Sequence, residues 1–207
     1  VRATAPPLAP PAGRGGRTPG TARSPGSDAS GSDARRYCRR TRADSQWGWR
    51  LTVEIVDTVD ALTPTWLDRA LELSGPRSVT GLEQRPLGTG QMCDSHRIRL
   101  THADGTGSSL IAKFPSSDPS SRSTGLLLRA YEKEIRFYQQ LAPTLPVRTP
   151  TAHVAAIDTD SGSFMLLLDD LDPARPGDQL AGCDLTAARA ALGELVGLHA
   201  PRWGDPA

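Results

Sequence analysis

The chain has 207 residues, a formal net charge of +1 and 37% hydrophobic residues, a composition typical of globular proteins. Its three cysteines, Cys38, Cys93 and Cys183, are odd in number and far apart, so the sequence indicates neither a disulfide framework nor a zinc site. No apolar run approaches the ~18 residues that a membrane helix needs. We therefore expect a cytoplasmic protein with no metal site of its own and no membrane partner.

Residues 1–50 differ in composition from the rest of the chain. They hold ten arginines, three aspartates, six prolines and seven glycines, so their net charge is +7, and residues 51–207 carry −6. Residues 1–50 contain too few apolar side chains to offset the entropy cost of folding. We therefore expect a disordered leader at 1–50, from an extended or misplaced translation start, and an ordered domain at 51–207. The basic run 35–40 holds a single aromatic residue, and we expect no nucleic-acid partner.

The ordered part is predicted to begin with a helix. Thr63 followed by Pro64 is typical of an N-cap and a first helical turn. The helical period then predicts one apolar face made of Trp66, Leu67, Ala70 and Leu71.

A glycine turn between two strands follows this helix. The segments 79–86 and 95–100 have the character of strands, and Gly88 and Gly90 lie between them. Glycine lacks a Cβ, so the backbone of such a turn can approach a ligand closely. An Asp-Gly turn within 103–107 then predicts a hairpin that leads into a third strand.

The third strand, 110–114, contains Lys113, one of only two lysines in a chain with 22 arginines. An ammonium group is a compact point charge on a flexible stem, whereas the guanidinium group of arginine is a broad planar fork. We therefore predict that Lys113 serves phosphate oxygens and one carboxylate partner.

A candidate carboxylate partner, Glu134, lies 21 residues further along the chain. The stretch 126–141 has a helical period and predicts one continuous helix. Its apolar stripe consists of Leu127, Tyr131, Ile135, Tyr138 and Leu141. Glu134 falls within this stripe and either pairs with Lys113 or reaches water at the edge of the stripe, which is the commoner arrangement for a single glutamate.

The remaining segments predict two strands, an acidic connector and a helix. The strands are expected at 153–158 and 164–168, and the connector continues through Asp169, Asp170 and Leu171. The last helix should begin at Asp184 and place His199 at its end or in the core. Its common face consists of Leu185, Ala188, Leu192, Leu195, Val196 and His199. The fold class is therefore α+β, with an antiparallel sheet of about five strands.

This order of elements resembles the amino-terminal lobe of the protein-kinase-like fold. Within that fold it is most similar to the small-molecule phosphotransferases grouped with aminoglycoside phosphotransferases, choline kinases and ecdysteroid kinases. The resemblance covers residues 60–205 and depends on the order and spacing of several motifs. They are Ile111-Ala112-Lys113-Phe114, Glu134-Ile135-Arg136-Phe137-Tyr138, Leu166-Leu167-Leu168-Asp169-Asp170-Leu171, Pro176-Gly177-Asp178-Gln179 and Gly197-Leu198-His199-Ala200-Pro201.

The resemblance implies an ATP site. Lys113 would hold the α and β phosphates and Glu134 would fix the lysine, while Gly88 and Gly90 would belong to the turn over the phosphates. No third glycine follows Gln91-Met92-Cys93, which departs from the protein-kinase pattern. The connector residues Leu168, Asp169, Asp170 and Leu171 match the hinge that reads the adenine edge, with Leu166 and Leu167 as walls for the base.

The resemblance also implies an enzyme whose catalytic loop is not in this sequence. The family takes its catalytic aspartate and its Mg²⁺ ligands from a His-Gly-Asp loop and a later aspartate, and residues 1–207 contain no counterpart. We expect the nucleotide-binding half of a kinase that transfers phosphate from ATP to a small hydroxylated substrate, in a gene that continues past Ala207. Two alternatives stay open, namely a regulatory, pseudokinase-like module and an α+β interaction domain.

Overall fold

The computed structural model describes residues 36–43, 46–88, 91–175, 177–178 and 180–204, and for residues 36–53 it describes the backbone alone. All of these residues belong to one compact unit, Asp33–Ala207. The expectation for residues 1–35 lies outside the described residues.

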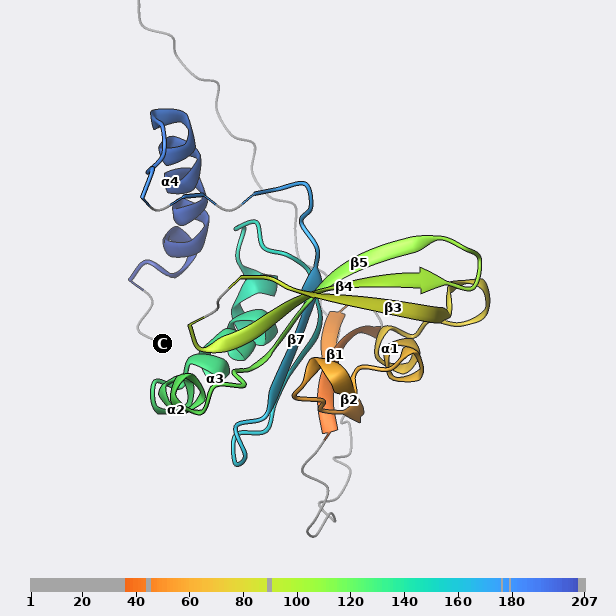
Figure 1. The fold of residues 1–207 in the computed structure, drawn as a ribbon. Helices are drawn as coiled ribbons and strands as arrows, with labels where there is room; N and C mark the ends of the chain where they lie inside the picture. Colours follow the sequence, from red (N-terminus) through yellow and green to blue (C-terminus); the bar gives the residue numbers. More distant parts are fainter. Residues whose placement is uncertain (1–35, 44–45, 89–90, 176, 179, 205–207) are drawn as a thin grey trace, which may run out of the picture. The chain divides into compact units, whose positions relative to one another are not determined.

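The described residues form a seven-stranded sheet in the order β2-β1-β6-β7-β5-β4-β3, in which the pairs are antiparallel (Figure 1). The five predicted strands are all present, contiguous from β6 to β3, so the α+β class is confirmed. The strand bounds are Arg36–Ala43 (β1), Gln46–Glu54 (β2), Val79–Pro86 (β3), Cys93–His102 (β4), Gly107–Pro115 (β5), Ala152–Ile157 (β6) and Phe164–Asp169 (β7).

The strands β1 and β2 correct the predicted extent of the disordered leader. The leader was expected to reach residue 50, but β1 pairs with β2 along its length and with β6 through Arg39 and Val154. An arginine-rich segment can enter a sheet because the ladder bonds join backbone groups, whatever the side chains are. Strands β1 and β2 therefore place residues 36–43 and 46–50 of the predicted leader in the sheet.

Helices cover the two faces of the sheet. One face packs against α1, Pro64–Leu71, whose Leu67 and Ala70 join a core with Ile98, Leu110 and Phe114. The other face packs against α3, Ala130–Arg136, whose Tyr131 and Ile135 join a second core with Phe164, Leu166 and Leu168. Strand residues alternate between the two cores because successive side chains point to opposite faces.

The predicted start of α1 is confirmed in detail. Thr63 accepts a hydrogen bond from the backbone N–H of Trp66 at 3.1 Å, and Pro64 occupies the first turn. The shorter helical turns are the 3₁₀ segments Val59–Ala61, Gly75–Arg77, Ala142–Thr144 and Ala200–Arg202.

The single helix predicted for 126–141 is wrong. The structure divides this stretch into α2, Pro119–Leu127, α3, Ala130–Arg136, and a π-helical turn, Phe137–Leu141. The break falls at Arg129, which is left-handed with φ of 52°. Leu127, expected on the buried stripe, is 83% exposed, and Leu141 is exposed as well.

The last helix, α4, Leu185–His199, starts at the predicted cap, where Asp184 accepts a hydrogen bond from Ala187 N–H at 2.7 Å. Its apolar residues are not part of a core, since Leu185 is 75% and Val196 63% exposed, and His199 is exposed too. Contacts instead come from the opposite side, where Glu194 pairs with Arg148. Among the described residues, no helix combines the length and apolarity needed to cross a membrane.

Candidate functional site

Lys113 and Glu134, the two residues that carry the functional prediction, form an ion pair. The Nζ of Lys113 lies 2.5 Å from Oε1 of Glu134. Their side chains are 22% and 32% exposed, so the pair is partly buried and partly accessible to solvent. Glu134 therefore takes the paired arrangement, and the sequence hypothesis that joined these two residues is confirmed.

The sheet and α3 position this pair. Lys113 is in β5, with Ser95 of β4 and Leu166 of β7 as its Cα partners, so its backbone is held from both sides. Its neighbours Ala112 and Phe114 are buried in the core under α1, which turns the lysine toward the face that α3 covers.

The turn before β4 is described in part. Gly88 has φ of +55°, a left-handed conformation that favours glycine, and a Cβ there would meet nothing within 4 Å. Gly90 lies outside the described residues. After the turn the chain enters β4 at Cys93, one residue past Met92, whose carbonyl oxygen accepts a hydrogen bond from the hydroxyl of Tyr131 in α3.

The connector after β7 is anchored by its two aspartates. Asp169 pairs with His153 of β6 at 2.6 Å. Asp170 has a side chain only 5% exposed; it accepts a hydrogen bond from the Ser109 hydroxyl at 2.5 Å and another from Nη2 of Arg97 at 3.0 Å. The Nε of Arg97 lies 2.7 Å from the second carboxylate oxygen, an ion-pair contact whose direction does not suit a hydrogen bond.

The acidity of both aspartates reflects these contacts. Burial acts to raise the pKa of Asp170, but the hydrogen bonds from Ser109 and Arg97 outweigh it, and the pKa lies below its usual value. For Asp169 burial is likewise outweighed, by hydrogen bonds from Thr151 and His153, and its pKa is lowered. Both carboxylates are therefore charged at neutral pH.

The other connector residues depart from the predicted roles. Leu166 and Leu167 were expected to wall a base together, but each is fully buried, in the core under α3 and in the core under α1, respectively. Adjacent residues of a strand point to opposite faces, so the two cannot line one site. Leu168 is buried as well, and Leu171 is exposed.

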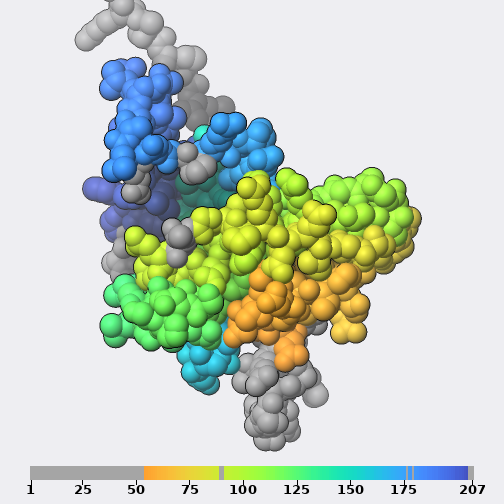
Figure 2. All heavy atoms as spheres, in the orientation of Figure 1, coloured from red at the N-terminus to blue at the C-terminus, as the bar shows by residue number. Residues whose placement is uncertain are grey.

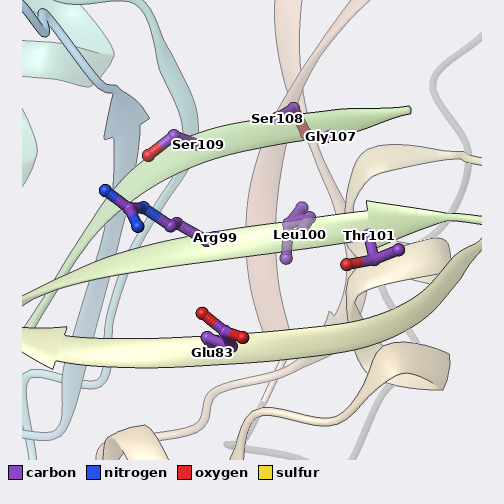
Figure 3. Close-up of a pocket in the computed structure, with 7 residues that line it drawn as sticks. All are labelled: Glu83, Arg99, Leu100, Thr101, Gly107, Ser108 and Ser109. Atoms are coloured by element: carbon purple, nitrogen blue, oxygen red, sulfur yellow. The ribbon is translucent and has the colours of Figure 1, made fainter. Parts of the chain in front are cut away.

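Two hollows lie over strands β4 and β5, and one of them borders the connector. One, of about 300 Å³, is lined by Arg97, Arg99, Ser109, Asp170 and Asp172. The other, of about 440 Å³, shares Arg99 and Ser109, and Figure 3 shows the Arg99 guanidinium extending from β4 toward Ser109 on β5. In Figure 2 the surface of β3, β4 and β5, in yellow and light green, is broad and open to solvent on the side in view.

Sequence reasoning missed Arg97, Ser109 and Tyr131. Each is polar on a strand or helix whose pattern was read for its apolar face, and each finds its partner far along the chain, such as Asp170 for Arg97. The alternation in β4 puts Arg97 and the buried Ile98 on opposite faces of the sheet, and this is the one sequence signal that Arg97 faces the site. Comparison with protein-family models, curated proteins and solved structures gave no significant match.

Proposed function

We propose that this chain is the nucleotide-binding part of an ATP-dependent small-molecule phosphotransferase. The observation that carries the proposal is the ion pair between Lys113 and Glu134, at 2.5 Å on the α3 face of the sheet. In the proposed complex the Lys113 ammonium contacts the α and β phosphates of ATP, and Glu134 keeps that ammonium in place.

Composition and local structure support the same reading. The chain uses arginine for almost all of its basic residues, whereas this position has a lysine. The Lys113 backbone is fixed between two neighbouring strands and its ammonium is paired with a carboxylate, which suits the role of a point charge. The left-handed Gly88 precedes β4, whose first residues pair with the end of β5 that contains Lys113, and the connector is anchored at Ser109, four residues before the lysine in β5. The connector backbone between Asp169 and Leu171 would contact the base.

Phosphoryl transfer needs further groups. The described residues contain no cluster of three or more His, Cys, Asp or Glu side chains suited to a metal ion, so they do not fit Mg²⁺ by themselves. In the proposed enzyme, Mg²⁺ and the hydroxylated acceptor are bound by residues that the resemblance places in a second lobe. We therefore assign nucleotide binding to this chain and leave the transfer step to the intact enzyme.

The test measures ATP binding to the full 207-residue chain, by NMR chemical-shift changes and by calorimetry. We expect ATP to perturb the signals around Lys113, and Lys113→Arg and Glu134→Gln each to weaken binding at least tenfold, about 1.4 kcal/mol. Arginine is too broad for a position shaped by an ammonium, and glutamine lacks the charge that fixes it. In the intact enzyme the same two variants should lower ATP-dependent turnover at least tenfold.

The matched control is Lys133→Arg, one residue before Glu134 on the exposed side of α3. An exposed charge contributes little, so this variant should bind ATP as the unaltered chain does. Nucleotide binding that survives Lys113→Arg would refute the site and favour an interaction domain. Binding that depends on Lys113, in an intact gene product without phosphotransferase activity, would favour the regulatory alternative.

A further inference from the structure

Tyr131 joins the helix of the ion pair to the turn before β4. Its hydroxyl donates a hydrogen bond to the carbonyl oxygen of Met92 at 2.5 Å and accepts one from the backbone N–H of Ser116 at 3.5 Å. The side chain is 3% exposed, so both of these hydrogen bonds to the backbone are shielded from solvent. Burial raises the pKa of Tyr131, and the phenol therefore stays a hydrogen-bond donor at neutral pH.

The packing around Tyr131 fixes its position. Its ring stacks on Phe164 of β7 with the ring centroids 4.5 Å apart. On the α2 side, Gly125 lies so close that an added Cβ would be 2.5 Å from the Cζ atom of Tyr131. The ring is thus held between a strand and a helix, and its hydroxyl has little freedom to leave Met92.

The same short helix carries both contacts of the proposed site. Tyr131 and Glu134 are three residues apart in α3, Ala130–Arg136, which places them on neighbouring parts of one helical face, about 4.5 Å apart along the axis. Glu134 reaches Lys113 on β5, while Tyr131 reaches the chain entering β4. A displacement of α3 would therefore move both contacts together.

We propose that Tyr131 is a positioning residue that holds the chain entering β4, at Met92, at a fixed spacing from the Lys113–Glu134 pair, and thereby aligns this segment for the phosphates of a nucleotide. This inference rests on the proposed function and adds to it a named residue outside the recognised motifs. The hydroxyl acts through the Met92 carbonyl and touches no ligand itself.

The test compares ATP with adenosine, using the full chain and the variant Tyr131→Phe. Phenylalanine keeps the ring and its stacking but loses the hydroxyl, so we expect the dissociation constant for ATP to rise about fivefold and that for adenosine to stay within about twofold. A general loss of structure would weaken both ligands alike. Amide exchange at residues 91–93 should also become faster.

Two further variants complete the design. Gly125→Ala should reproduce the selective loss of ATP affinity, because its methyl group displaces the Tyr131 ring. Tyr138→Phe removes the other described tyrosine hydroxyl, for which no hydrogen bond is seen among the described residues, and should leave exchange at 91–93 unchanged. If the unaltered chain binds ATP and Tyr131→Phe binds both ligands normally, the inference is overturned. If the unaltered chain fails to bind ATP, the proposed function fails first.

Discussion

The anchoring of the connector by Asp170 gives the sharpest test of the fold around the site. The substitution Asp170→Asn keeps the size of the side chain but removes the charge that faces Arg97 and one of the two carboxylate oxygens. With a side chain only 5% exposed, Asp170 is the buried member of this ion pair. The variant leaves the Arg97 guanidinium without its main counter-charge.

The magnitude follows from the burial of the two partners. Removing one partner of a fully buried pair costs about 3–5 kcal/mol. Arg97 is 23% exposed and also lies 3.5 Å from Asp172, which is itself 68% exposed, so water and a second carboxylate compensate in part. We therefore expect Asp170→Asn to lower the free energy of unfolding by about 2–3 kcal/mol.

The assay is urea unfolding of four proteins: the unaltered chain, Asp170→Asn, Arg97→Met and the double variant. A coupling energy of about 2 kcal/mol between the two positions is expected from this cycle. Asp172→Asn serves as the control, and because that carboxylate is largely exposed its cost should stay below about 0.5 kcal/mol. A coupling under about 0.5 kcal/mol, or equal costs at Asp170 and Asp172, would show that the connector is held by something else.

Three further outcomes are expected from the described contacts. In α4, Gly193→Ala should raise the free energy of unfolding by about 0.5–1 kcal/mol because the added methyl group meets nothing within 4 Å. Gly197→Ala should lower the free energy of unfolding because the added methyl group would lie 2.6 Å from the Pro146 carbonyl oxygen. Urea unfolding midpoints compare the two variants, and equal effects would contradict the docking of α4. The pKa of Asp170 in the folded chain lies below its usual 3.8, so the contribution of its charge to stability is complete above pH 3.8 and is lost as the pH falls through the folded-state pKa. Lowering the pH should therefore reduce the free energy of unfolding more steeply for the unaltered chain than for Asp170→Asn, and parallel curves of unfolding free energy against pH would refute this. Ile135→Ala empties a fully buried position in the core under α3 and should cost about 2–5 kcal/mol by thermal or urea unfolding, with a cost below about 1 kcal/mol contradicting the packing described.

The sequence was sufficient for features that depend on local chemistry. Alternation at 95–100 predicted β4, and short apolar runs predicted β5 and β7. The side chains of Thr63 and Asp184 marked two helix starts that the structure bears out. The Lys113–Glu134 pair was also foreseen, because a carboxylate inside an apolar stripe needs a nearby cation. These inferences need only the period of an element and the requirement that buried polar groups be paired.

The remaining features depend on contacts that local patterns do not contain. The helical period of the sequence continues through Leu126–Leu128, so this pattern does not predict the turn at Arg129. That turn lets Gly125 approach the ring of Tyr131, a tertiary contact. Likewise, an apolar stripe predicts burial for Leu185 in α4, yet whether a stripe meets a partner is decided by the rest of the fold.

The hairpin of β1 and β2 has a consequence for how this chain associates. Through Arg39 and Val154 it pairs with β6, which would otherwise be the last strand on that side of the sheet. A chain that began at Leu51 would lose β1 and most of β2 and leave the N–H and C=O groups along β6 free to recruit strands from other molecules. The arginine-rich hairpin would then protect the sheet against aggregation, and its removal should show first as self-association at high protein concentration.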